Sequence, residues 1–201
     1  MHRPRRLDPR QFPQDTTTLA RWLLGKLLVR HFGDTRAIVR LVETEGYVQN
    51  DPACHAFAGR TARNDSLFLA PGHAYVYFCY GAHWLLNVSS EPAGVGSGVL
   101  LRAAEPVSGE HLLQRNAPNV ARADLCRGPG RLARALGVDR RFDGLDLLRG
   151  RELWLAEDGC IVRDADVGVS TRIGIRLAAE RPLRFYLRGH AGLSGPKRLN
   201  A

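Results

Sequence analysis

Residues 37–47 read AIVRLVETEGY, and this stretch predicts the strand around which the fold is built. Side chains of a strand alternate between its two faces, so Glu43, Glu45 and Tyr47 project from the same face. That face begins with apolar residues and ends in two carboxylates and a phenol, with Glu45 and Tyr47 about 7 Å apart. By itself, a carboxylate at this place is either a solvated strand end or a base held at the floor of a pocket.

The composition predicts a single domain without a membrane anchor. The chain has 201 residues and 44% hydrophobic content, which suits one domain with a sizeable core. No apolar run is long enough to span a bilayer, and no apolar segment follows the basic start as a secretory signal requires. The four cysteines form no Cys-x-x-Cys pair, which indicates reduced thiols in a cytoplasm and no structural zinc.

The charge balance is strongly basic. Lys and Arg number 29 against 20 Asp and Glu, which leaves a net charge of +9. Such an excess indicates a polyanionic partner, most simply nucleic acid. The alternative is that the arginine content only reflects the base composition of the genome.

The order of predicted elements favours an α+β fold. Residues 1–14 hold four arginines among prolines and form an expected flexible basic arm, and 15–201 form the single domain. Apolar residues at 19–28 recur at helical spacing after a possible cap at Asp15. Further strands are predicted at 74–78, 84–90, 99–105, 152–156, 172–175 and 183–188, and short helices at 108–117 and 129–136. Without βαβ alternation, these elements predict a mostly antiparallel curved sheet with short flanking helices and a protruding β-hairpin.

Two irregular segments are candidates for contact with a ligand. The connection at 48–72 is long for a compact domain and carries His55 and Arg63, a mixture that favours a ligand-lining loop. The second segment is the hairpin loop at 79–83, where Gly81 can adopt positive φ. Tyr80 stands at its tip, where a large aromatic side chain has no core to fill. Either Tyr80 meets a partner, or a neighbouring loop of the same domain covers it.

Several catalytic motifs can be excluded. The glycines at 94–98 lack the third glycine of a dinucleotide-binding loop, and a strand follows them where a helix is required. A zinc deaminase needs His-x-Glu with Pro-Cys-x-x-Cys, and a serine hydrolase needs Gly-x-Ser-x-Gly; the chain has neither. Cys54 and His55 are sequence neighbours and cannot easily face each other as a nucleophile and its base.

A set of motifs in fixed order resembles the alkyladenine (3-methyladenine) DNA glycosylase family. The motifs are VETEGY at 42–47, RN at 63–64 through PG at 71–72, YVYFCYG at 75–81, NVSS at 87–90, LLRAAEP at 100–106, GP at 128–129 and PLRFY at 182–186. Their order and spacing agree with the family from about residue 19 to residue 189. The resemblance is specific because several independent motifs agree.

The resemblance implies a monofunctional glycosylase that cuts the N-glycosidic bond of a damaged purine in duplex DNA. It makes Glu45 the catalytic carboxylate and Arg102 the arginine beside the catalytic water. The pocket residues that it implies are Tyr47, His55, Tyr77 and Asn87, and the wedge that replaces the flipped base is Tyr80 with Gly81. We expect Arg63 to contact DNA, and we expect the protein to act as a monomer without a cofactor or metal. If the protein is bacterial, we expect it in the cytoplasm, associated with the nucleoid. One departure is Ala82, where the family often has a large apolar residue, so the wedge could be weaker.

The chemistry agrees with these residue types. Cleavage of a glycosidic bond gives the sugar oxocarbenium character, which a carboxylate can stabilise while it deprotonates a water. A purine alkylated at N3 or N7 is cationic, leaves without protonation and stacks well between aromatic faces. Asn87 could exclude guanine by clashing with its exocyclic amine. A neutral lesion such as hypoxanthine would need a proton donor, for which His55 is the candidate.

Other interpretations stay open at this point. Tyr47 and Tyr77 could be ordinary strand aromatics, Asn87 a turn-capping residue, and Arg102 a structural partner of Glu43. The protein could also be a non-enzymatic binder of damaged DNA, or an RNA-binding protein that uses the same hairpin. Only Glu45 distinguishes an enzyme from a binder, because a binder has no use for a buried base.

Overall fold

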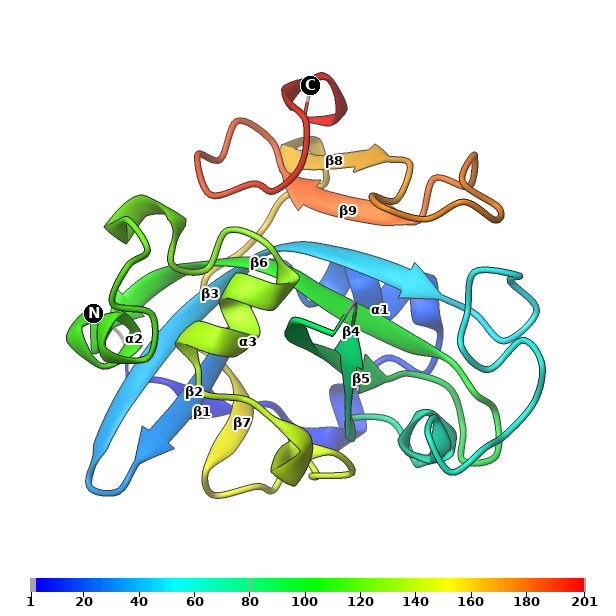
Figure 1. Ribbon diagram of the computed structural model, residues 1–201, viewed down its shortest axis with the longest axis horizontal. Coiled ribbons are helices and arrows are strands. Elements are labelled where there is room, and N and C mark those ends of the chain that lie inside the picture. The colour runs from blue at the N-terminus through cyan, green and yellow to red at the C-terminus, as the bar shows by residue number, and fades with distance from the viewer. Residues whose placement is uncertain (1–2, 80, 201) are drawn as a thin grey trace.

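The computed structural model describes residues 3–79 and 81–200, and a nine-stranded sheet forms its centre (Figure 1). The main path of the sheet runs β1-β7-β2-β3-β6-β5-β4. Outside this path, β9 pairs with β3 and β8 pairs with β9, and all of these pairs are antiparallel. The strands are β1 (Arg5–Arg6), β2 (Leu27–Phe32), β3 (Thr35–Tyr47), β4 (Ala74–Cys79), β5 (His83–Ser89), β6 (Gly98–Ser108), β7 (Leu153–Glu157), β8 (Val167–Ser170) and β9 (Arg184–Leu187). The predicted α+β class and mostly antiparallel sheet are confirmed.

β3 is the central strand, and its neighbour changes half-way along. β6 pairs with it on one side from Ile38 to Tyr47. On the other side, β2 pairs with its first half and β9 with residues 43–45. Three register shifts in the β3–β6 ladder, two of them at Glu43, accommodate this change. The Glu-Thr-Glu segment is therefore hydrogen-bonded on both edges of the strand.

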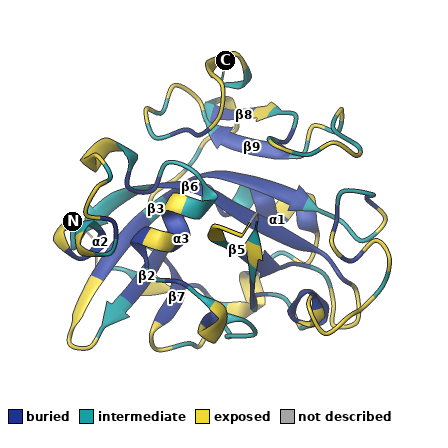
Figure 2. Cartoon of the chain, in the orientation of Figure 1, coloured by how far each residue is buried: buried dark blue, intermediate teal, exposed yellow. Residues whose placement is uncertain are grey.

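Short helices cover the sheet. The α-helices are α1 (Thr16–Trp22), α2 (Glu110–Asn116) and α3 (Pro129–Ala135). One-turn 3-10 helices occupy Pro9–Gln11, Asp65–Phe68, Arg122–Asp124, Arg140–Phe142, Asp164–Asp166 and Lys197–Leu199. Leucines of all three α-helices join β2, β3, β5 and β6 in the main core, which leaves β3 and β6 buried along most of their length (Figure 2).

The predicted helix across 19–28 is wrong in its second half. Asp15 caps α1 as expected, since its carboxylate accepts a hydrogen bond from the Thr18 N–H at 2.7 Å. The helix ends at Trp22, and Gly25 at φ 79° then reverses the chain. Leu27 and Leu28 belong to β2 and enter two different apolar clusters, so their helical spacing is a coincidence.

The strand predicted at 172–175 is also wrong. β8 ends at Ser170, and the following residues form an irregular loop. Within this loop, Arg172 and Ile173 hydrogen-bond to the end of β3 in place of a ladder partner. The other predicted strands and helices are confirmed, with ends shifted by one to three residues.

The N-terminal arm contributes a strand to the sheet, and β4 and β5 pair along the hairpin. In the arm at 1–14, Arg5 and Arg6 pair with β7 as β1, and Leu7 and Phe12 are buried. In the hairpin of β4 and β5, Cys79 pairs with His83, and Tyr80 lies outside the described residues. Among the residues that the structure describes, no helix is long and apolar enough to cross a membrane.

Candidate active site

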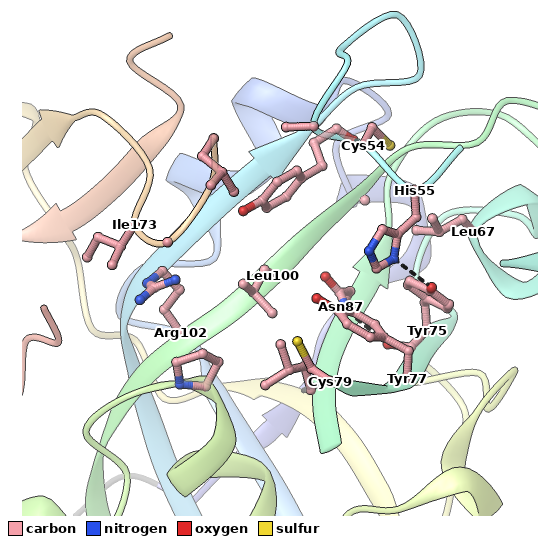
Figure 3. A pocket seen from close by; sticks show the side chains of 17 residues that line it. Cys54, His55, Leu67, Tyr75, Tyr77, Cys79, Asn87, Leu100, Arg102 and Ile173 are labelled. Carbon is pink, nitrogen blue, oxygen red and sulfur yellow. Dashed lines mark hydrogen bonds between the residues drawn. The ribbon is translucent and has the colours of Figure 1, made fainter. Parts of the chain in front are cut away.

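A pocket of about 330 Å³ opens where the ends of β3, β4, β5 and β6 meet (Figure 3). The loop that carries His55 and the loop after β8 complete its walls. The lining residues are Tyr47, Ala53, Cys54, His55, Leu67, Tyr75, Tyr77, Cys79, Leu85, Asn87, Gly98, Leu100, Arg102, Pro129, Ile173, Gly174 and Ile175. Five of the residues that the sequence singled out therefore share one cavity: Tyr47, His55, Tyr77, Asn87 and Arg102.

Glu45 lies directly behind the wall of this pocket. Its side chain is fully buried, and it accepts three hydrogen bonds. Tyr47 Oη donates to Oε2 at 2.9 Å, Arg102 Nη1 donates to Oε2 at 3.1 Å, and the Ile173 N–H donates to Oε1 at 2.7 Å. All three donors line the pocket, so the groups that bind the carboxylate are the ones that stand between it and the pocket.

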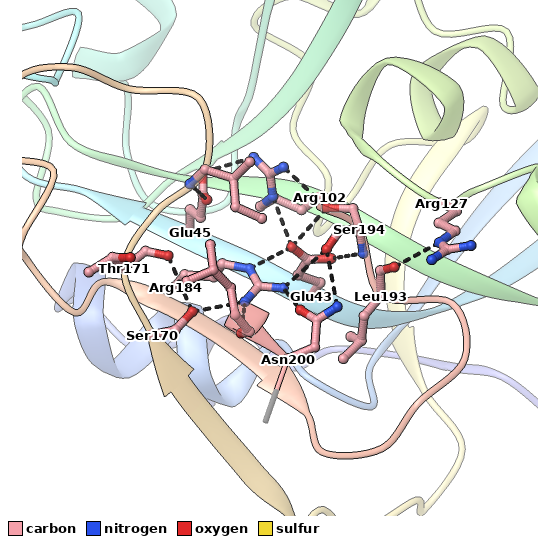
Figure 4. Close-up of polar contacts among 12 residues, drawn as sticks. Glu43, Glu45, Arg102, Arg127, Ser170, Thr171, Arg184, Leu193, Ser194 and Asn200 are labelled. Carbon is pink, nitrogen blue, oxygen red and sulfur yellow. Dashed lines mark hydrogen bonds and ion pairs between the residues drawn. The ribbon is translucent and has the colours of Figure 1, made fainter. Parts of the chain in front are cut away.

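Arg102 joins both carboxylates of the Glu-Thr-Glu segment (Figure 4). Its Nε donates to Glu43 Oε1 at 2.9 Å, while its Nη1 binds Glu45. Burial opposes the charge of the guanidinium, but Glu45 and Glu43 outweigh burial and raise the pKa of Arg102. Arg102 is therefore the predicted structural partner of Glu43 and also lines the pocket; its role beside a catalytic water stays a prediction.

Glu43 anchors this cluster from the side away from the pocket. It accepts hydrogen bonds from Arg184 Nε at 2.7 Å, from the Ser194 N–H at 2.6 Å and from Ser194 Oγ at 2.9 Å, besides the bond from Arg102. Burial raises the pKa of Glu43, but Arg102 and Arg184 outweigh burial and hold the pKa below its ordinary value. The two carboxylates share Arg102, and their other partners differ, although they are only two residues apart.

Aromatic side chains form the opposite wall. The rings of Tyr75 and Tyr77 stack with centroids 5.2 Å apart, and His55 meets the Tyr77 ring edge-on at 4.5 Å. His55 Nδ1 lies 2.9 Å from the Tyr75 hydroxyl. Burial and the charge of Arg63 lower the pKa of His55, which keeps the imidazole neutral at pH 7. Burial raises the pKa values of both tyrosines, which stay protonated.

Asn87 lies in the middle of β5, so it is not a turn-capping residue. It is buried, faces the pocket, and its Nδ2 donates to the Tyr75 carbonyl at 3.1 Å. This bond fixes the orientation of the amide group relative to the aromatic wall.

Two of the residues expected to contact DNA, Arg63 and Gly81, are exposed, and the third, Tyr80, lies outside the described residues. The exposed Arg63 guanidinium is 6.0 Å from the centre of the Tyr77 ring. Gly81 is exposed at the end of the hairpin with φ 64°, as predicted for its turn. A second groove of about 560 Å³ adjoins the base of the hairpin, and we call it the hairpin groove. Its lining includes His83 and three arginines, Arg127, Arg131 and Arg134.

A family model described as methylpurine-DNA glycosylase matches residues 10–191. The chain belongs to this family. The match covers the pocket and all of the elements that build it, which confirms the resemblance seen in the motifs.

Bacterial relatives of this family extend the match over nearly the whole chain. A protein of Mesorhizobium japonicum is 53% identical over 189 residues, which cover 94% of this chain and 90% of its own length. A protein of Paraburkholderia phytofirmans is 49% identical, covering 93% and 87%, and one of Carboxydothermus hydrogenoformans is 42% identical, covering 94% and 98%. All three bear the name "Putative 3-methyladenine DNA glycosylase".

Sequence reasoning missed several residues of this glycosylase site. Tyr75 could have been found, because it alternates with Tyr77 on the same face of β4. Ile173 and Ser194 reach Glu45 and Glu43 through their backbone N–H groups, and a backbone contact leaves no signature in residue type. Arg184 lies in the PLRFY motif, but nothing in that motif indicates that it binds Glu43.

Proposed function

We propose that this protein is a monofunctional DNA glycosylase that flips an alkylated purine out of duplex DNA and excises it by hydrolysis. The observation that carries the proposal is Glu45, a fully buried carboxylate held by Arg102 and Tyr47 directly behind an aromatic pocket. A protein that only binds DNA gains nothing from such a group. The family and the names of its relatives support the same activity. A DNA substrate would place the protein at the nucleoid.

In this proposal the pocket holds the flipped base between Tyr47 on one side and Tyr77 with His55 on the other. A water enters beside Arg102, and the Glu45 carboxylate takes its proton as the water attacks the sugar C1′. Negative charge on Glu45 also stabilises the oxocarbenium character of the sugar. A purine alkylated at N3 or N7 is already cationic and leaves without protonation.

A neutral lesion requires a donor at the departing base, and in this proposal an N–H of His55 is the candidate. His55 Nδ1 lies 2.9 Å from the Tyr75 hydroxyl. In the tautomer in which Nδ1 accepts from that hydroxyl, Nε2 carries the proton and can donate a hydrogen bond to the base. Asn87 Nδ2 donates to the Tyr75 carbonyl at 3.1 Å, which holds the amide group in place. In this proposal the amide clashes with the exocyclic amine of normal guanine and so excludes that base from the pocket.

The surface around the pocket supports a duplex partner. The hairpin that carries Tyr80 stands between the pocket and the hairpin groove, and Cys79 and Leu85 line both cavities. We assign Tyr80 as the wedge that fills the space of the flipped base, and the arginines of the hairpin groove and Arg63 as phosphate contacts.

Release of free base from methylated duplex DNA tests the proposal. The wild type should release 3-methyladenine and leave an abasic site, whereas Glu45→Gln should bind the lesion duplex and lose at least about a hundredfold in single-turnover rate, roughly 2.7 kcal/mol. Glu180→Gln, an exposed carboxylate of the same type, serves as the control. No release by the wild type from alkylpurine, ethenoadenine or hypoxanthine duplexes would refute the activity. A Glu45→Gln rate within about tenfold of wild type would mean that another group is the base.

A further inference from the structure

Arg172 is a buried cation that the chemistry described so far does not use. Its side chain is fully inaccessible to solvent, although it lies in the irregular loop between β8 and β9. Nη1 donates to the Gly46 carbonyl at 3.0 Å, and Nη2 donates to the Ala178 carbonyl at 3.2 Å. The guanidinium carbon lies 4.6 Å from the centre of the Tyr47 ring.

Asp51 supplies the countercharge, and it is fully buried as well. Its Oδ2 is 2.6 Å from Arg172 Nη1. Even so, Asp51 Oδ2 and Arg172 Nε each lack a hydrogen-bond partner among residues 3–79 and 81–200. A buried ion pair of this kind contributes little net stability, because two desolvation costs offset the attraction. Its retention beside the pocket therefore calls for a reason other than stability.

The position of Arg172 relative to Tyr47 gives that reason. Tyr47 lines the pocket and Arg172 does not, so the guanidinium covers the tyrosine ring from behind. A base stacked on the pocket side, at a contact distance of about 3.5 Å, would lie about 8 Å from the guanidinium carbon. That separation is shorter than the Debye length of about 10 Å, and the ring excludes water from the space between the two groups.

We propose that Arg172 is a positioning residue that sets which charge of base the Tyr47 ring accepts. This inference rests on the proposed glycosylase function. A cation behind the ring draws its π-electron density away from the pocket face, which weakens stacking with a second cation and favours a neutral, electron-rich purine. The charge of Arg172 thereby reduces the binding advantage that cationic alkylpurines have in an aromatic pocket. The range of lesions that the pocket accepts then extends to neutral bases.

The test compares a cationic with a neutral lesion in one sequence context. Single-turnover release is measured for 7-methylguanine and for hypoxanthine duplexes, and equilibrium binding of both is measured in the Glu45→Gln background, where turnover is blocked. Arg172→Lys keeps the charge and loses the planar contact. Arg172→Met with Asp51→Asn removes both charges of the buried pair. Arg181, whose Nη1 lies 3.9 Å from Asp51 Oδ2, is partly exposed and stays in contact with solvent. Arg176→Met removes an exposed arginine of the same loop and is the control.

The ratio of cationic to neutral lesion is the decisive readout, because loss of structure lowers both values together. We expect the charge-free double variant to raise this ratio about fivefold or more, and Arg172→Lys and Arg176→Met to leave it within about twofold. An unchanged ratio in the double variant would overturn the inference and leave Arg172 a structural residue. If the double variant does not fold by circular dichroism, Arg172→Gln with Asp51→Asn, which keeps polar groups at both positions and leaves neither charge, replaces it with the same expectation. A wild type that releases 3-methyladenine but neither of these two lesions would overturn this inference alone, whereas a wild type that releases none of the three would refute the glycosylase function itself.

Discussion

Glu43→Gln should destabilise the protein severely, because it removes the negative charge that Arg102 and Arg184 share. It also places an NH2 group, a hydrogen-bond donor, against groups that are themselves donors. Glu43 is fully buried and accepts four hydrogen bonds of 2.6–2.9 Å from Arg102, Arg184 and Ser194. A glutamine keeps the shape, but its NH2 group faces at least one of these donors. Breaking a buried ion pair on one side costs about 3–5 kcal/mol, since the remaining cations are left uncompensated.

The size of this loss can be measured by urea unfolding. For a chain of this size the expected fall in melting temperature is roughly 6–20 °C, at about 2–4 °C per kcal/mol. Glu180→Gln is the exposed control and should change the free energy of unfolding by less than about 0.5 kcal/mol. A Glu43→Gln loss below about 1 kcal/mol would refute the reasoning and show that the two guanidinium groups find other partners.

The loss of unfolding free energy in Glu43→Gln should depend on pH. The pKa of Glu43 is lowered in the folded protein, so its ionised form contributes stability above the pKa of about 4.5 that it has when unfolded. This contribution is lost as the pH falls through the lower, folded pKa. The difference in unfolding free energy between wild type and Glu43→Gln should therefore shrink as the pH falls below about 4.5 and stay constant between pH 6 and 8. A difference that grows on acidification would contradict the direction of the shift.

Three further outcomes concern DNA. Tyr80→Ala should weaken binding of lesion duplex by about 1–3 kcal/mol, as loss of a stacking side chain does, and slow release from a well-paired lesion more than from a mismatched one; unaltered binding with a melting temperature several degrees lower would assign Tyr80 to the core. Arg131→Ala should reduce the log–log salt slope of DNA binding by about 1, and an unchanged slope would remove Arg131 from the phosphate contacts. Borohydride should trap no covalent DNA adduct, because the only lysines, Lys26 and Lys197, do not line the pocket.

Local pattern was enough to predict the parts of the fold that depend on neighbours in sequence. The alternation at 37–47 predicted β3 and the shared direction of Glu43 and Glu45, because two-residue periodicity follows directly from strand geometry. Asp15 was predicted as a cap for the same reason, since capping acts within one helical turn.

Where the prediction failed, a contact distant in sequence decided the structure. Leu27 and Leu28 continue the helical spacing of α1, but pairing with β3 and β7 draws them into a strand. Arg172 and Ile173 look like strand residues, but their partners Gly46 and Glu45 lie more than 120 residues earlier. Such contacts leave no local periodicity, and only the family resemblance brought the distant segments together.

The placement of Glu43 and Glu45 at the beginning of the chain has a consequence for its synthesis. Their partners Ile173, Arg184 and Ser194 follow them by 128–151 residues. At about 5–20 residues per second, a ribosome needs about 6–30 s to make these partners after the two glutamates have been added. Until then Glu45 lacks its bond from the Ile173 N–H, and Glu43 lacks its bonds from Arg184 and Ser194, so the hydrogen bonding of the two carboxylates is incomplete. A truncated product that lacks the last twenty residues would keep Tyr47, Arg102 and Ile173, the three donors to Glu45. It would lose Arg184 and Ser194, which leaves Arg102 as the remaining partner of Glu43 that the structure describes.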